Sequence, residues 1–218
     1  MSTTDHKPTL LILLRTDPGI RATYQAGVVA AFPDLRVDVV ANVADADPFL
    51  PNADMMITHG PHLDGRSRHV FGLAQRLKWV QGIGTGVDNI ADCPTLHADA
   101  IVTNIHGVHG TPMSEAAIML MLALSRKLPR SLDNKTRRTW ENWPSRLLSG
   151  KTVGILGMGS IANSMGPRFK AFEMTVLGIT SGVRPVAGFD HVYDKSRLTE
   201  VVAGLDYLVV LTPYSPPR

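Results

Sequence analysis

The first hundred residues alternate between short apolar runs and longer segments with helical periodicity. Segments 20–32 and 67–77 have the length and spacing of helices, and Pro33 would end the first of them. The apolar runs predict buried strands at residues 9–16, 35–41, 54–60, 78–84 and 100–106. Strands that alternate with helices usually pair in parallel, so this part predicts a doubly wound α/β domain.

The pattern changes at Ser114, where a long apolar segment begins. Ser114 is suited to cap a helix that would run to residue 128, before Pro129. The segment is apolar nearly all round, so we expect it to be buried on most sides and to link one domain to the next. Trp140 and Trp143 follow, and we expect them to pack at a domain or subunit contact.

A second α/β unit is predicted near the end of the chain. Its expected elements are a strand at 152–156, a helix at 160–172, a strand at 175–179, a short helix at 196–205 and a last apolar strand at 207–211. This βαβαβ order is one mononucleotide-binding half of a Rossmann domain. The predicted organisation is a substrate domain over 1–110, a linker helix and interface segment over 111–149, and an incomplete nucleotide-binding domain over 150–218.

A glycine turn joins the first strand and the helix of this second unit. It reads Gly157-Met158-Gly159-Ser160-Ile161-Ala162, a GxGxxA pattern. The first glycine permits a tight turn, the second lets a pyrophosphate approach the backbone, and the alanine allows close packing of helix and strand. The helix N-terminus offers N–H groups to the phosphates. We therefore predict cofactor binding by residues 157–161, against the alternative of a purely structural turn.

The next strand ends without the acidic residue that usually binds the adenosine ribose. Thr180 and Ser181 stand there, and Arg184 follows three residues later. Without a carboxylate a 2′-phosphate is not repelled, and Arg184 with the two hydroxyls could bind it. These residues favour NADP over NAD, with a solvated loop cation as the alternative reading of Arg184.

Composition and charge exclude several classes of protein. Of the 218 residues, 44% are hydrophobic and 19% charged, as in an ordinary globular protein. The net charge is only +3, and the densest basic stretch, 126–138, is interrupted by Asp133, so we expect a solvated helix there and no nucleic-acid partner. The longest apolar helical run, 116–124, falls well short of the ~20 residues of a membrane span. A single cysteine, Cys93, excludes an internal disulfide and fits a reducing, cytoplasmic compartment.

Four motifs together resemble the D-isomer-specific 2-hydroxyacid dehydrogenase family, in particular its glyoxylate/hydroxypyruvate reductase-like members. They are WVQGIGTGVDNI (79–90), HGVHGTPMSEAAIMLMLALSRKLP (106–129), GKTVGILGMGSIA (150–162) and DYLVVLTPYSP (206–216). Their order and spacing match the family, and two unrelated motifs flank the apolar helix in the correct order.

The resemblance implies a flavodoxin-like substrate domain into which a Rossmann domain is inserted, with the active site between them, in a homodimer. It implies hydride transfer between a nicotinamide and a small 2-keto or 2-hydroxy acid, such as glyoxylate or hydroxypyruvate. Backbone N–H groups of Gly84, Thr85 and Gly86 would bind the substrate carboxylate. At Thr212 and Pro213 the chain would run past the nicotinamide ribose and the pyrophosphate of the cofactor.

The family's catalytic Arg, Glu and His all lie beyond the last motif and have no counterpart here. We therefore predict no catalytic residue, and we expect the 218-residue chain to be a fragment that is inactive alone. The last strand would be the third of six, which would leave strand 152–156 at a sheet edge. The alternative is a short, non-catalytic protein that binds a nucleotide or covers its edge with a partner or a second copy.

Four histidines were weighed as further candidates. His106 and His109 have His-x-x-His spacing, but spacing places no third ligand beside them, so no metal site is predicted. The resemblance to the family motif implies that they shape a hinge loop. His59 and His62 follow the third strand and could face the cleft.

Overall fold

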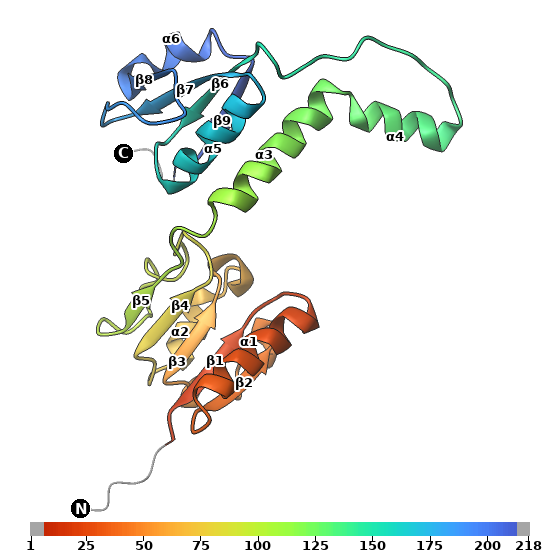
Figure 1. The fold of residues 1–218 in the computed structure, drawn as a ribbon. Helices are drawn as coiled ribbons and strands as arrows, with labels where there is room; N and C mark the ends of the chain where they lie inside the picture. Colours follow the sequence, from red (N-terminus) through yellow and green to blue (C-terminus); the bar gives the residue numbers. More distant parts are fainter. Residues whose placement is uncertain (1–6, 213–218) are drawn as a thin grey trace, which may run out of the picture. The chain divides into compact units, whose positions relative to one another are not determined.

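The computed structural model describes residues 7–212 and divides into two compact units, residues 1–106 and 107–218. Each unit is an α/β layer with its own sheet (Figure 1). The segment 111–149, predicted to be a linker helix and interface segment, falls within the second unit. In the described part of the chain, no helix is both long enough and apolar enough to cross a membrane.

The first unit contains a five-stranded sheet in which every neighbouring pair is parallel. The strands lie in the order β2-β1-β3-β4-β5, which is the flavodoxin-like order. Their bounds are β1 (Thr9–Leu13), β2 (Arg36–Val40), β3 (Met55–Thr58), β4 (Trp79–Gly82) and β5 (Ile101–Thr103). All five lie inside the apolar runs that predicted them, so the prediction of this layer is confirmed.

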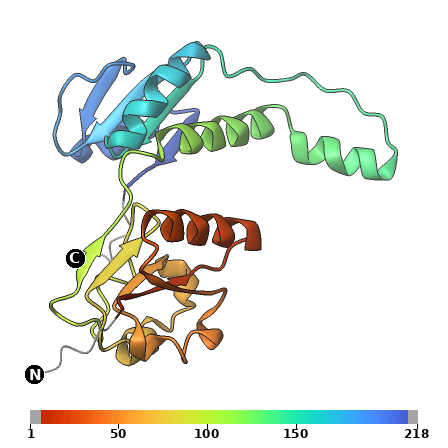
Figure 2. The ribbon, with the colours of Figure 1, turned by 60° about the horizontal axis from the view of Figure 1, so that its bottom comes forward.

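Apolar side chains cover both faces of this sheet. Figure 2 shows the red helix of residues 18–31 and the orange segments on opposite sides of its strands. Helix α1 (Pro18–Ala31) begins after Asp17, whose side chain accepts a hydrogen bond of 2.7 Å from the Gly19 N–H, and it packs against Leu10 and Ile12. The opposite face is covered by α2 and by short turns of 3-10 helix. Their bounds are α2 (Ser67–Leu73), η1 (Val43–Asp45), η2 (Leu50–Asn52) and η3 (Gly60–Leu63).

The second unit contains a four-stranded parallel sheet in the order β8-β7-β6-β9. This is the order of the first four strands of a Rossmann sheet, 3-2-1-4. The bounds are β6 (Thr152–Leu156), β7 (Thr175–Thr180), β8 (His191–Asp194) and β9 (Tyr207–Val210).

The prediction of a βαβαβ half is wrong in one element, strand β8. This strand has only four residues, none of them fully buried, so it lacks the apolar run that marked the other strands. Because β8 takes the third place, the last strand β9 is the fourth. Strand β6 consequently pairs with β7 on one side and β9 on the other, and it is not the edge that we expected.

Two helices pack side by side in the second unit, α3 (Gly110–Ser125) and α5 (Ser160–Ala171). Helix α5 places Met165 and Phe169 in the same buried cluster as Val153 and Ile155 of β6. The two helices approach closely at Gly110, where a Cβ atom would lie 2.6 Å from the Cβ atom of Ser164. Between β8 and β9 the chain forms η4 (Lys195–Arg197) and α6 (Leu198–Val202).

Two expectations for the apolar helix are wrong. Helix α3 begins at Gly110, and Ser114 lies buried inside it, where its hydroxyl donates to the Gly110 carbonyl at 2.6 Å instead of capping the first turn. The helix is also not buried on most sides, because it packs on one side only. Met119, Leu120 and Leu124 are exposed, the last by 68%.

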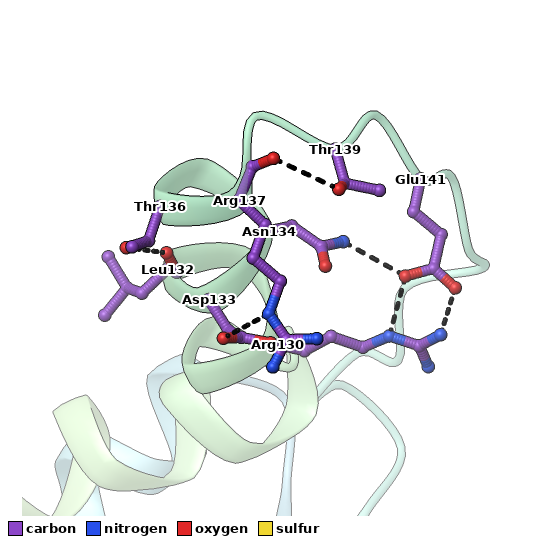
Figure 3. Close-up of polar contacts among 8 residues, drawn as sticks. All are labelled: Arg130, Leu132, Asp133, Asn134, Thr136, Arg137, Thr139 and Glu141. Atoms are coloured by element: carbon purple, nitrogen blue, oxygen red, sulfur yellow. Dashed lines mark hydrogen bonds and ion pairs between the residues drawn. The ribbon is translucent and has the colours of Figure 1, made fainter.

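Helix α4 (Leu128–Arg137) extends away from the four-stranded sheet, and the following segment returns along it (Figure 1). None of its residues is buried, as expected of a solvated helix. Figure 3 shows how the return is held: Glu141 accepts hydrogen bonds from Asn134 at 3.0 Å and from Arg130 at 2.9 Å. These bonds lower the pKa of Glu141. Trp140, expected at a contact, is 93% exposed.

Candidate functional site

The turn after β6 has a geometry that only glycine can adopt at its first position. Gly157 has a φ of +101°, and a Cβ atom there would lie 3.1 Å from the Leu211 carbonyl carbon and 3.2 Å from the Thr212 nitrogen. Its N–H donates to the Ile179 carbonyl at 2.9 Å. The turn is therefore fixed from both sides by the strands that flank β6.

The second glycine of the turn, Gly159, faces open space. It precedes the first turn of α5 with an ordinary φ of −88°, and no atom lies within 4 Å of the position that a Cβ would take. No side chain caps this end of the helix. Ala162, by contrast, is fully buried. The first N–H groups of α5 thus point to a surface that a phosphate could approach.

A cleft of about 400 Å³ lies at the carboxyl end of β7 and is also lined by Val192 of β8. It brings together Met158, Thr180 and Arg184, which the sequence predicted to bind cofactor. The remaining lining residues are Gly182, Val183, Val186 and Val192. None of these lining residues carries a carboxylate, so no negative charge from them would repel a phosphate.

The other predicted cofactor residues that the structure describes are not among the residues that line this cleft. Ser160 and Ser181 are exposed, and Ile161 is half-buried. Thr212 follows β9 and approaches Gly157 through its backbone. Pro213 lies outside the described residues.

In the first unit, the loop after β4 is tied to the segment that follows β5. The Asn104 side chain donates to the Thr85 carbonyl at 2.7 Å, and the Ile105 N–H donates to the Gly84 carbonyl at 3.1 Å. Thr85 and Gly86 are exposed. The Asp88 carboxylate approaches the loop, with one oxygen 2.7 Å from the Cβ position of Gly86.

His59 packs directly against this loop. Its Nε2 atom lies 2.9 Å from the position that a Cβ on Gly84 would occupy. The His59 ring also meets the His62 ring edge-on, with centroids 4.9 Å apart. This contact was not predicted, because it joins the ends of two neighbouring strands. Its signal in the sequence was that His59 directly follows β3 and Gly84 lies two residues after β4.

Burial lowers the pKa of both histidines, since it disfavours the charged imidazolium. For His62 the nearby His59 and Arg15 lower the pKa further, while Asp64 raises it. The Arg15 N–H donates to Nδ1 of His62 at 3.3 Å. Across residues 7–212, no three His, Cys, Asp or Glu side chains gather closely enough to hold a metal ion.

The four-stranded sheet and its glycine turn have the architecture of a partial Rossmann domain, the class of α/β fold in which dinucleotides bind at such a turn. Comparison with known proteins gives the family. Residues 118–217 match the family described as D-isomer specific 2-hydroxyacid dehydrogenase, NAD binding domain. This region of the chain is therefore similar to the NAD binding domain of that family, and the match confirms the resemblance found in the motifs.

Solved structures and curated relatives agree with this assignment. A D-isomer specific 2-hydroxyacid dehydrogenase family protein from Aeromonas salmonicida is 31% identical with a TM-score of 0.80, and the match covers 96% of this chain and 65% of that one. An NADPH-dependent glyoxylate/hydroxypyruvate reductase from Sinorhizobium meliloti, solved with NADP and sulfate, is 26% identical with a TM-score of 0.75 over 96% and 64% of the two chains. D-3-phosphoglycerate dehydrogenase of Methanocaldococcus jannaschii is 27% identical over 94% of this chain. The chain spans only 39% of that relative's length.

The lowered pKa values of His59 and His62 predict how the stability of the first unit depends on pH. In the unfolded chain both histidines take up protons near pH 6.5, whereas in the folded chain they do so only at a lower pH. The free energy of unfolding should therefore fall as the pH drops below about 6.5, and this contribution should be flat above it. Hydrogen exchange of the β1 amides at pH 7.5 and 5.5 measures the difference.

His62→Gln should reduce this pH dependence, and the exposed His97→Gln should leave it unchanged. An equal loss of protection at pH 5.5 in the unmodified chain and in His62→Gln would show that His62 is not its source.

Proposed function

We propose that this chain supplies the cofactor half and the substrate loop of an NAD(P)-dependent 2-hydroxyacid dehydrogenase. The observation that carries the proposal is the glycine turn, where the approach of Leu211 fixes Gly157 while Gly159 leaves the start of α5 open. A bound nicotinamide would supply or take up the hydride. Residues 157–161 and Thr212 would bind the pyrophosphate side, and Pro213 would follow them in the chain.

The substrate in this proposal is a small 2-keto or 2-hydroxy acid of the glyoxylate or hydroxypyruvate kind. The loop Gly84-Thr85-Gly86 lies at the carboxyl end of a parallel strand, where open α/β sheets bind ligands. Its glycines permit a carboxylate to approach the backbone. The proton transfer that accompanies hydride transfer is assigned to none of the described residues.

Gly159→Leu tests the cofactor site without disturbing the fold. The new side chain would enter open space, so we expect the melting temperature to stay within about 2 °C while NADPH affinity falls at least about tenfold, because the side chain blocks the phosphates. Fluorescence titration with NADPH measures the affinity.

Gly27→Leu is the matched control, since Gly27 also has no atom within 4 Å of its Cβ position but lies on α1 of the other unit. Unchanged NADPH binding in Gly159→Leu would remove the turn from the cofactor site.

We propose NADP as the preferred cofactor, with Arg184, Thr180 and Ser181 around the 2′-phosphate. Arg184 lines the cleft at the end of β7, where the other lining residues bring no carboxylate. The Sinorhizobium relative was solved with NADP, which supports the same choice.

Arg184→Ala should weaken NADPH binding about tenfold and leave NADH binding nearly unchanged, because only NADPH carries the phosphate that the guanidinium would bind. Calorimetry with both cofactors measures this, and Arg137→Ala on α4 is the control. Tighter binding of NADH than of NADPH by the unmodified chain would contradict the preference.

A second candidate function is a non-catalytic, dimer-forming nucleotide-binding protein. Exposed apolar residues of the second unit favour a dimer in either case, and we propose a second copy of the chain as the partner. The residues are Met119, Leu120, Leu124, Leu128, Leu132, Trp140 and Leu147. NADPH oxidation by the purified chain with hydroxypyruvate or glyoxylate would exclude the non-catalytic reading.

Leu124→Glu should convert the dimer to a monomer, because it places a charge in the centre of the apolar contact. Light scattering after size-exclusion chromatography measures the mass. Ile20→Glu on α1 is the control, since Ile20 is also exposed but lies in the other unit. A monomeric unmodified chain at micromolar concentration would contradict the dimer.

A further inference from the structure

The cluster around His59 lies at a special point of the first sheet. In the order β2-β1-β3-β4-β5 the chain reverses direction of travel between β1 and β3. Ligands of open α/β sheets bind outside the carboxyl ends of the strands at such a switch point. Arg15 follows β1, His59 follows β3 and Gly84 follows β4, so the cluster stands at this point and beside the proposed substrate loop.

The cluster consists of Arg15, His59, His62 and Asp64, and its side chains carry little net charge. Arg15 forms an ion pair with Asp64, and both histidines favour the neutral form because they are partly buried. The Asp88 carboxylate adds a negative charge near Gly86. The surface beside the loop is therefore polar, but it does not offer an excess of positive charge.

A neutral imidazole can both donate and accept a hydrogen bond. The Nδ1 atom of His62 already accepts from the Arg15 N–H, and the His59 ring lies between His62 and the loop. In a small 2-hydroxy acid, C3 lies only two bonds from the carboxylate carbon. A carboxylate held at Gly84–Gly86 therefore leaves the C3 substituent within reach of the His59 ring.

We propose that His59 is a specificity-determining residue that hydrogen-bonds a hydroxyl group on C3 of the substrate. This inference rests on the proposed binding of the substrate carboxylate at the loop 84–86. In this role His59 selects acids with a C3 hydroxyl over those with a C3 methyl group. A methyl group buried against the imidazole would leave a ring nitrogen without a hydrogen-bond partner.

The same cluster disfavours a phosphate on C3. A phosphate dianion needs cationic partners to replace its water, and the one arginine described in this cluster is already paired with Asp64. The chain should therefore differ in this respect from a protein that acts on 3-phosphoglycerate, the acid in the name of its curated relatives.

Three stable acids test the inference on the full chain saturated with NADP⁺. D-Glycerate carries the C3 hydroxyl, D-lactate carries a methyl group, and 3-phospho-D-glycerate carries the phosphate. NMR titration reports binding at the backbone amides of Thr85 and Gly86 and separately at the imidazole of His59. We expect D-glycerate to bind about tenfold more tightly than either of the others, and it should be the acid that shifts the imidazole signals.

His59→Leu should reduce the ratio of D-glycerate to D-lactate affinity to about one and leave D-lactate affinity within about twofold. His59→Gln, which keeps a donor and an acceptor, should restore part of the preference. The exposed His97→Leu is the matched control and should keep the full ratio.

The outcomes separate this inference from the proposed function. Equal binding of D-glycerate and D-lactate with shifts at Thr85 and Gly86, an unchanged ratio in His59→Leu, or tightest binding of 3-phospho-D-glycerate would overturn the role of His59 while the loop remains a carboxylate site. Absence of any shift at Thr85 and Gly86 with all three acids would overturn the proposed loop itself, and the role of His59 with it.

Discussion

The parallel pairing of the strands is the constraint on which both candidate sites depend. Every strand pair in the described sheets is parallel, so all strands of a sheet end at the same edge. In the first unit this brings the residues after β1, β3 and β4 together, although they are far apart in the sequence. In the second unit it gathers the glycine turn, the end of β7 and Thr212. Neither site is built from one continuous segment.

Much of the fold could be predicted, because strands buried on both faces appear as apolar runs of strand length. Strand β8 could not, since its four residues are only partly buried and no helix separates it from β7. That single omission caused the wrong count for β9 and the wrong edge for β6. The start of α3 was misjudged for a different reason: a serine serves equally as a cap or as a buried residue bonded to the preceding turn, as Ser114 is.

The candidate sites also contain some features that the sequence predicts and others that it does not. The glycine turn is a local motif with a local physical reason, and Met158, Thr180 and Arg184 do line one cleft. The contact between His59 and Gly84 is non-local, so the spacing of residues carries no signal for it. The burial of α3 was overestimated because its apolar residues lie on all sides of the helix. In the described chain only the side that faces α5 is covered.

The contact between Gly157 and the backbone of Leu211 and Thr212 has a consequence for how the protein forms during synthesis. More than fifty residues separate Gly157 from Leu211, so this contact joins parts of the chain that are far apart in sequence and has a high contact order. While the ribosome has released only the chain up to α6, β6 has one partner strand fewer and Gly157 lacks half of its surroundings. The proposed nucleotide binding therefore requires β9 to have docked beside β6, and a bound cofactor would stabilise the sheet with β9 in place.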